Sequence, residues 1–154
     1  MDTKKLFHMA IGLLVAAALS AGSVSVSAAQ ETATVVLAGY KVNPPVSTPA
    51  AGTALVTYRN DSLFVEGSFS DLNSFYRGAG IHYGTKRENG NQVLKLSSEL
   101  NEDHTGGTFR AGDNAFKLTE ALKTALGQGR LYINIYTQMQ PRGELRGQIP
   151  ALSG

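Results

Sequence analysis

Hydrophobic and polar positions alternate in two runs near the end of the chain, on either side of a Pro141-Arg142-Gly143 turn. The apolar positions all have odd numbers and are Leu131, Ile133, Ile135, Leu145 and Ile149. The positions between them are polar or amphipathic and are Tyr132, Asn134, Tyr136, Glu144, Arg146 and Gln148. A period of two is typical of β-strands that bury one face. The two runs therefore predict two strands, each with an aliphatic side and a polar side.

Earlier parts of the chain show the same short periodicity, interrupted by turn-forming residues. The pattern predicts strands at residues 34–38, 52–59, 62–69, 78–84 and 92–97, with a short edge strand at 108–110. Asn60-Asp61 fits the turn of a hairpin between the second and third of these strands. Prolines make residues 39–51 an extended connection, because proline has no backbone donor for a sheet. Many short strands at close spacing predict an all-β sandwich or barrel.

One stretch follows a helical period instead. Its apolar side chains have the spacing i, i+3, i+4, i+7 and i+8, and they are Leu118, Ala121, Leu122, Ala125 and Leu126. Such a stripe is typical of a helix that buries one side. Thr119 is suited to the N-cap, and Gly127 and Gly129 are suited to the helix end. A short helix is marginal by itself in water, so we expect this one to pack on the sheet.

The first 29 residues have the three-part pattern of a secretory signal peptide. Lys4 and Lys5 precede an apolar run at residues 9–19, and small residues follow it as far as Ala29. This run is shorter than the roughly 20 residues that a membrane-spanning helix needs. We therefore predict that residues 1–29 are cleaved. Residues 30–154 would form a single exported domain, extracellular or periplasmic, with no membrane span.

Charge and cysteine content narrow the class of protein further. The full chain has 14 basic and 12 acidic residues, and removing Lys4, Lys5 and Asp2 leaves 12 against 11. No basic run remains, so the sequence indicates no nucleic-acid partner. The chain has no cysteine, so an exported fold would depend on packing and strand pairing without disulfides. The pattern indicates no particular oligomeric state.

The landmarks of residues 30–154, in their order, resemble the CHRD domain, a family named for the secreted protein chordin. The most specific is GELRGQI at residues 143–149, and the others include LAG at 37–39, NPPV at 43–46, GIHYG at 80–84 and YINI at 132–135. The resemblance covers nearly all of this range. The sequence is similar to stand-alone bacterial members of the family. It implies an immunoglobulin-like antiparallel β-sandwich of the Greek-key type in a secreted protein. It implies no reaction.

The GELRGQI motif has a structural interpretation. Gly143 and Gly147 permit a close backbone approach or a bulge. Glu144 and Arg146 lie two apart on a strand and share a face, where they can pair or reach neighbouring strands. If the pair is buried, loss of one partner would cost roughly 3–5 kcal/mol. We expect the motif to maintain the fold, and the alternative is that it binds a ligand.

A metal site is the sharpest alternative that the resemblance offers. The resemblance implies a His-x-His pattern on the central strand of many members of the family, with a third histidine on the penultimate strand. This layout is similar to that of copper–zinc superoxide dismutase. Here these positions are Gly80, His82 and Tyr136, so one imidazole of three remains. Zinc and copper sites usually use three or four protein ligands. His82 is therefore a weak metal candidate. We predict no cofactor, and a copper or zinc redox protein is the alternative function.

Other chemistry finds little support in the sequence. The acidic loop with Glu99, Glu102 and Asp103 lacks the ligand spacing of an EF-hand. The chain has no Gly-x-Ser-x-Gly elbow and no cysteine nucleophile. Only two histidines, His82 and His104, lie outside the predicted signal peptide, so the sequence does not indicate a catalytic triad. We therefore expect a protein that is not an enzyme.

Recognition is the function that the sequence favours. Tyr132, Asn134 and Tyr136 lie on one strand face, opposite the aliphatic residues, and His82 and Tyr83 lie on the strand predicted at residues 78–84. Tyrosine combines a large apolar ring with a polar tip, which suits contact with protein or polysaccharide. We predict an extracellular binding or structural module with these five residues as candidate contacts. The alternative is that a helix or the second sheet covers the tyrosine rings.

Overall fold

The computed structural model describes residues 29–153, so the predicted signal peptide lies outside the described residues except for Ala29. The elements in chain order are β1 (Glu31–Ala38), a 3₁₀ turn η1 (Gly39–Lys41), β2 (Ala51–Arg59), β3 (Ser62–Ser70), β4 (Tyr76–Tyr83), β5 (Gln92–Leu96), β6 (Glu99–Leu100), β7 (Gly107–Phe109), β8 (Ala115–Lys117), α1 (Glu120–Gly127), β9 (Leu131–Thr137) and β10 (Leu145–Ile149). Within residues 29–153, no helix has the length and apolar character needed to cross a bilayer.

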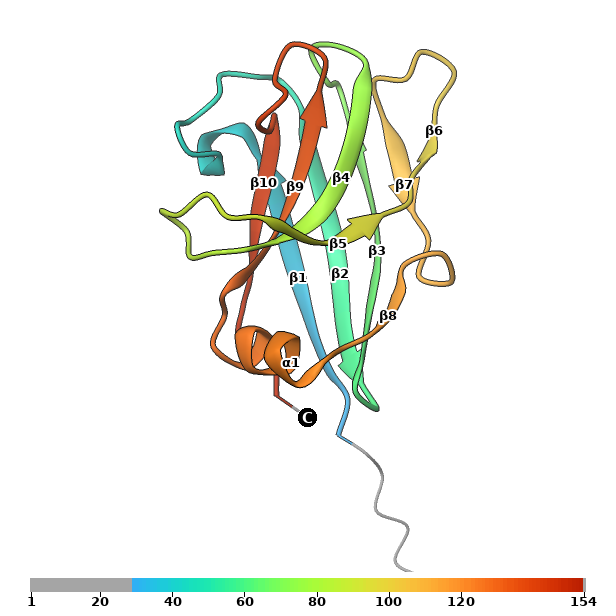
Figure 1. Cartoon of the computed structure of the whole chain (residues 1–154). Helices are drawn as coiled ribbons and strands as arrows, with labels where there is room; N and C mark the ends of the chain where they lie inside the picture. Colours follow the sequence, from blue (N-terminus) through green and yellow to red (C-terminus); the bar gives the residue numbers. More distant parts are fainter. Residues whose placement is uncertain (1–28, 154) are drawn as a thin grey trace, which may run out of the picture.

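The strands form one continuous antiparallel sheet that curls into two facing layers (Figure 1). One layer has the order β5-β4-β9-β10, and the other has the order β1-β2-β3-β7-β6 with β8 beside β3. The layers are joined where β10 meets β1, with Ala38 opposite Arg146. The prediction of an all-β antiparallel fold with one short helix is confirmed.

The core lies between the two layers and is built from alternate residues of the strands. The inward-facing residues of β9, β10 and β3 are buried, and they are Leu131, Ile133, Ile135, Leu145, Ile149, Leu63, Val65 and Phe69. Complete burial of one such side chain stabilises the fold by about 1.5–3 kcal/mol. The period of two in the sequence therefore identified the correct inner faces of β9 and β10.

The long strands follow their predicted positions and the short edge strand is present as β7, one residue earlier than predicted, whereas β6 and β8 were not predicted. The β2–β3 hairpin turns at Asn60-Asp61, whose φ angles of 49° and 59° suit a two-residue type I′ turn. β1 begins three residues earlier than predicted, because Glu31–Ala33 continue the pairing with β2. β6 lies within the predicted polar loop, and β8 lies where no strand was predicted. Two or three residues are too few to show a strand period.

The predicted helix is present as α1. It begins after Thr119, whose hydroxyl oxygen accepts a hydrogen bond from the Leu122 N–H at 3.4 Å. Ala125 and Leu126 are buried in the core, which agrees with the apolar stripe. Gly129 has a φ of 64°, a left-handed conformation that glycine adopts readily at helix ends. The chain then enters β9 at one end of the sandwich (Figure 1).

The loop between β4 and β5 gives the outer surface of the first layer its shape. Figure 1 shows this yellow-green segment leaving β4, extending past β9 and β10, and returning as β5. We call residues 84–91 the covering loop. It lies over the polar face of β10 and contributes backbone groups to the site described below.

Candidate functional site

The polar face of β10 and of the residue before it is built from three side chains at alternate positions, Glu144, Arg146 and Gln148. Leu145 and Ile149 point into the core, so these three point outward. Outward-facing strand residues are usually exposed to water, but Glu144 and Arg146 are buried and Gln148 is half-buried. Arg146 and Gln148 are both bonded to the covering loop, and Glu144 is bonded to other connections.

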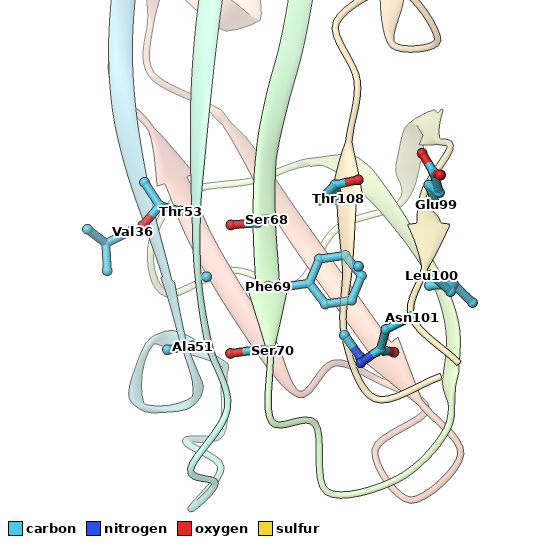
Figure 2. Close-up of a pocket in the computed structure, with 13 residues that line it drawn as sticks. Val36, Ala51, Thr53, Ser68, Phe69, Ser70, Glu99, Leu100, Asn101 and Thr108 are labelled. Atoms are coloured by element: carbon cyan, nitrogen blue, oxygen red, sulfur yellow. Dashed lines mark hydrogen bonds between the residues drawn. The ribbon is translucent and has the colours of Figure 1, made fainter. Parts of the chain in front are cut away.

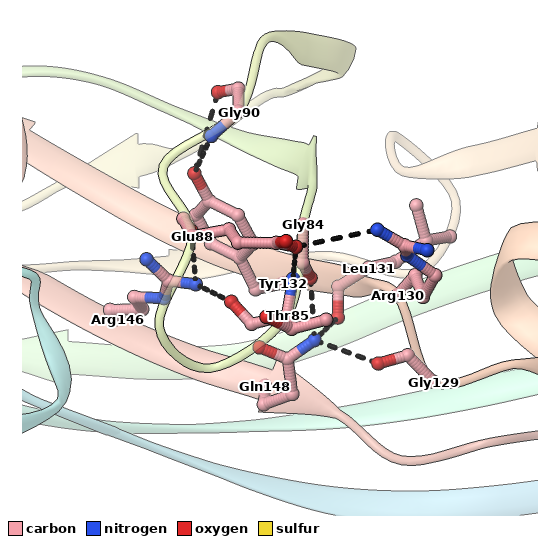
Figure 3. A network of polar contacts seen from close by, with 10 residues as sticks. All are labelled: Gly84, Thr85, Glu88, Gly90, Gly129, Arg130, Leu131, Tyr132, Arg146 and Gln148. Atoms are coloured by element: carbon pink, nitrogen blue, oxygen red, sulfur yellow. Dashed lines mark hydrogen bonds and ion pairs between the residues drawn. The ribbon is translucent and has the colours of Figure 1, made fainter.

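Arg146 fastens the covering loop to the sheet. Its Nη2 donates to the carbonyl oxygens of Thr85 at 2.5 Å and Glu88 at 2.9 Å (Figure 3), and its Nη1 donates to Oδ1 of Asn89 at 3.1 Å. The guanidinium lies over the ring of Tyr132, with Cζ 3.5 Å from the ring centroid. Burial lowers the pKa of Arg146, because desolvation disfavours the charged form. The loop oxygens and the ring compensate for this lost hydration.

Gln148 fastens the start of the covering loop to the segment between α1 and β9. Its Nε2 donates to the carbonyl oxygens of Gly84 at 2.9 Å, Gly129 at 2.9 Å and Leu131 at 3.0 Å (Figure 3). Three acceptors around one amide nitrogen fix the orientation of the side chain. Gln148 thus ties together two segments that are far apart in the sequence.

Glu144 fastens two further connections. Its Oε1 accepts hydrogen bonds from the Thr48 hydroxyl at 2.6 Å and the Asn73 N–H at 2.8 Å. Its Oε2 accepts a hydrogen bond from the Thr137 hydroxyl at 2.7 Å. A buried carboxylate is tolerated where donors satisfy its oxygens. Glu144 therefore joins the η1–β2 connection and the β3–β4 loop to β9.

Glu144 and Arg146 share a face, as their spacing predicts, but they bind different loops. Among residues 29–153 the ion pairs join other side chains, so the two motif charges do not pair with each other. Gly143 has a φ of 136° and lies against the Asn134 side chain, where a Cβ would collide. A Cβ on Gly147 would meet the backbone and side chains of β1. These contacts support the structural interpretation of the motif.

The structure brings four of the five predicted contact residues together around one pocket and buries two of them, whereas Tyr83 lies outside this group with its ring against Arg130. Tyr132 is 3% exposed and Asn134 is 4% exposed. His82 and Tyr136 are half-buried, and Tyr83 is exposed. Tyr132, Asn134 and Tyr136 therefore do not form an open face, because two of the three lie in the interior.

The covering loop, rather than a helix or the second layer, hides the ring of Tyr132. The Tyr132 hydroxyl accepts a hydrogen bond from the Gly90 N–H at 3.0 Å (Figure 3). The Asn134 side chain donates to the Arg142 carbonyl at 3.0 Å, which ties it to the turn before β10. Both side chains are thus occupied by contacts within the protein.

His82 lies between two tyrosine rings. Its ring is stacked on Tyr132 with centroids 5.2 Å apart and is edge-on to Tyr136 at 6.0 Å. Its Nδ1 donates to the Gly90 carbonyl at 2.9 Å, which leaves a lone pair on Nε2. Within the described residues, Nε2 is buried and has no hydrogen-bond partner. Burial lowers the pKa of His82, the hydrogen bond to the Gly90 carbonyl partly opposes this shift, and the charge of Arg146 adds to it, so the neutral imidazole predominates at pH 7.

A pocket of about 220 Å³ lies beside these rings, and we call it the aromatic pocket. Its walls include His82, Asn134, Tyr136 and Arg142, and none of its lining residues is acidic. A buried acceptor without a partner costs about 1–3 kcal/mol, which calls for an explanation such as a functional role. Complete small-ligand sites usually occupy about 300–1,000 Å³. The aromatic pocket is therefore suited to one group of a larger ligand.

The three positions of the alternative metal site lie close together but supply one imidazole. Gly80 and His82 are on β4, and both pair with β9, which carries Tyr136. A side chain at Gly80 would collide with Gln92, which accepts a hydrogen bond from the Tyr136 hydroxyl. Nowhere in residues 29–153 do three His, Cys, Asp or Glu side chains gather as a metal site. This set of donors does not fit a copper or zinc centre.

The acidic loop that was considered for calcium binds its own neighbours. Glu99 pairs with Arg110. Asp103 accepts hydrogen bonds from the backbone N–H of Thr105 at 3.0 Å and from its hydroxyl at 2.6 Å. These two carboxylates stabilise the loop through internal contacts.

Another hollow, of about 720 Å³, lies on the outer face of the other layer. Thr53, Ser68 and Thr108 lie opposite one another across β2, β3 and β7, and their small side chains line the hollow (Figure 2). Glu99 is at its edge, where it is paired with Arg110. The hollow presents the hydroxyl groups of Thr53, Ser68, Ser70 and Thr108 among apolar side chains such as Val36 and Leu100, and it contains none of the predicted contact residues.

Two facing antiparallel layers, joined where β10 pairs with β1, define a β-sandwich domain. A family model for the CHRD domain matches residues 33–149, and the chain therefore belongs to the CHRD domain family. Searches of curated proteins and of solved structures found no match to the chain. The matched range contains the covering loop, the aromatic pocket and the polar face of β10. The resemblance stated from the sequence is confirmed.

Three contributors to the site were not among the predicted site residues. Gln148 continues the alternation that begins at Glu144 and Arg146, so its spacing was a usable signal. Arg142 borders the aromatic pocket from the turn before β10. The covering loop contributes mostly backbone N–H and carbonyl groups, which leave no residue-specific signature in a sequence.

Proposed function

We propose that this CHRD-domain protein is an exported, non-catalytic binding module that contacts protein or polysaccharide outside the cytoplasm. The observation that carries the proposal is the aromatic pocket, where the neutral imidazole of His82 has an Nε2 acceptor with no partner among the described residues. Apolar walls with a few placed polar groups are characteristic of recognition sites. The family match and the signal-peptide pattern of residues 1–29 support export.

Polysaccharide is the partner that best fits the chemistry of this pocket. A sugar offers hydroxyl donors for an acceptor such as His82 Nε2, and an apolar C–H face for a tyrosine ring such as Tyr136. The pocket wall is also held in place, because Tyr132 lies between His82 and Arg146. A site that is ordered before binding loses less conformational entropy when the ligand arrives.

The proposal is tested by titrating the exported protein with neutral and acidic oligosaccharides in a calorimeter. Tyr136→Ala removes a ring from the pocket wall and is expected to weaken binding roughly tenfold. His82→Phe keeps the aromatic stack and removes the Nε2 acceptor, so we expect a similar loss. Phe75→Ala is the matched control, because Phe75 is 59% exposed and lies outside the aromatic pocket. Equal affinities for the wild type and the two pocket variants would contradict the proposed site.

A further inference from the structure

A second depression adjoins the aromatic pocket and differs from it in charge. It has a volume of about 540 Å³ and lies between residues 40–45 and the covering loop, above β10. Among residues 29–153, its lining includes no acidic side chain and four cationic ones, which are Lys41, Lys86, Arg87 and Arg146. We call this depression the basic cleft. Its volume is within the range of complete ligand sites, about 300–1,000 Å³.

The positive charge of the basic cleft is local. Residues 30–154 have 12 basic and 11 acidic side chains, so the chain as a whole is nearly neutral. In the described part of the chain, the cations of the four ion pairs are Arg110, Lys123 and Arg130, and no cation of the cleft is among them. Glu88 is adjacent to Arg87 in sequence, but its carboxylate binds the Thr85 N–H and Arg130. The cleft therefore has no counter-ion within residues 29–153.

The walls of the basic cleft are joined to each other. Asn43 Nδ2 donates to the Arg87 carbonyl at 2.7 Å, and Asn89 Nδ2 donates to the Asn43 carbonyl at 2.7 Å. Arg146 holds the same loop from the floor of the cleft. The cations are thus carried on a frame that is already ordered, which favours binding of a complementary ligand.

The cations are also close enough to affect one another. Lys41 Nζ donates to the Val36 carbonyl at 2.7 Å, which holds its charge at the cleft wall. Burial, together with the charge of Lys86, lowers the pKa of Lys41. A bound anion reduces the electrostatic repulsion between neighbouring cations. Such charge complementarity contributes to both affinity and specificity.

We infer that the basic cleft binds a carboxylate or phosphate group of an acidic polysaccharide, with a neighbouring sugar of the same chain in the aromatic pocket. The two depressions share Val42 and Arg146 in their walls, so one extended ligand can occupy both. Arg87 can donate two parallel hydrogen bonds to such an anion, and Lys86 adds a mobile point charge. The inference rests on the proposed function and specifies the class of polysaccharide.

A sugar polymer fits the combined site better than a nucleic acid does. Nucleic acids also carry phosphates, but their bases usually stack on open aromatic faces. Here Tyr132 is 3% exposed between Arg146 and His82, and the accessible pocket is small. An oligothymidylate is therefore included among the probes as the competing class of polymer.

The test compares an oligogalacturonate with its fully methyl-esterified form, which has the same backbone without charge. An oligomer of glycerol phosphate is the phosphate probe. The double variant Lys86→Ala/Arg87→Ala removes two exposed cations of the cleft, and Lys95→Ala/Lys117→Ala removes two exposed cations elsewhere. The wild type is expected to bind at least one acidic probe about tenfold more tightly than the ester, and the cleft variant to lose about tenfold. Added salt should weaken this binding.

Each other outcome overturns the inference. These outcomes are equal binding of the acid and the ester, no binding of either acidic probe, unchanged affinity in the cleft variant, equal losses in both double variants, and tighter binding of oligothymidylate. The test also distinguishes failure of this inference from failure of the proposed function. If the ester binds as well as the acid and His82→Phe weakens both, the aromatic pocket stands and the basic cleft has no role. Unchanged melting of the cleft variant shows that its loss is not a folding defect.

Discussion

Arg146 shows how backbone atoms can take the place of a carboxylate beside a buried cation. A buried charge is destabilising unless its donors find partners. Here three loop oxygens and the ring of Tyr132 supply them. Each of these partners belongs to a segment distant from Arg146 in sequence. The hydrogen bonds that stabilise the buried guanidinium therefore also fix the position of the covering loop.

Replacement of Arg146 by Met should destabilise the protein by roughly 3 kcal/mol, because charged hydrogen bonds and buried stacking are both lost. Arg146→Lys should recover only part of this loss, since lysine has no planar fork. Arg59→Met is the matched control, because Arg59 also lies over an aromatic ring, that of Phe64 at 4.7 Å, but is exposed. Its effect should be about 1 kcal/mol or less. Urea denaturation measures all three, and equal losses at positions 146 and 59 would contradict the fastening role.

His82 gives the stability a defined pH dependence. Burial and the nearby charge of Arg146 lower its pKa in the folded state below the ordinary value of about 6.5. As pH falls through this value, the unfolded chain takes up a proton before the folded protein does, so the free energy of unfolding decreases. Above about pH 7 both states are neutral, and the contribution of His82 is complete.

His82→Phe removes this titration and keeps an aromatic ring beside Tyr132. The stability of the wild type minus that of the variant should therefore decrease between about pH 7 and about pH 5 and stay constant above pH 7. Denaturation curves at several pH values measure the difference. A difference that rises on acidification would contradict the assigned direction of the shift.

The element that organises the site is the segment from Glu144 to Gln148. Its inner residues fill the core, while its outer residues fasten the covering loop, the α1–β9 connection and the loops around Thr48 and Asn73. One short segment thus determines where several loops lie. The covering loop forms a wall of both the aromatic pocket and the basic cleft.

A change within the covering loop tests this organisation. A Cβ on Gly90 would collide with the Tyr83 carbonyl, so Gly90→Ala must displace the loop. We expect a loss of about 1–3 kcal/mol and faster hydrogen exchange at loop amides, because the Tyr132 hydroxyl and the Arg146 donors lose their partners. At Gly112 a Cβ would meet nothing within 4 Å, so Gly112→Ala is the control and should be close to neutral. Equal effects of the two changes would show that the loop position is not fixed by these contacts.

The sequence predicted the long strands, the β2–β3 hairpin, α1 and the inner faces, because each has a period or a turn residue that local physics requires. It also placed His82 and Tyr136 on strands that prove to be neighbours. Covered tyrosine rings were the stated alternative, but the sequence did not predict that Asn134 is buried or that a loop, rather than a helix or the second layer, covers Tyr132. Their strand face is polar in the expected way, and only the tertiary position of the covering loop hides it. The basic cleft likewise joins Lys41 to Lys86 across 45 residues that show no common pattern.

At the scale of the whole molecule, the two outer faces differ in chemistry. The face of β2, β3 and β7 presents small hydroxyl side chains around its hollow (Figure 2). The opposite layer carries the aromatic pocket and the basic cleft side by side, with no acidic residue lining either. Although the chain is nearly neutral, cationic side chains cluster on this layer. The Nε2 acceptor of His82, which has no partner among the described residues, lies on the same layer. This asymmetry favours the first layer as the binding face.

The most direct test is an NMR titration of the isotope-labelled protein with an oligosaccharide that it binds in the calorimeter. We predict that the largest shifts of backbone amides fall on Gly90, Tyr136 and Arg142, which border the aromatic pocket. Amides of Thr53, Ser68 and Thr108 on the other layer should stay unchanged. Shifts confined to those three residues, with none at the pocket, would contradict the account.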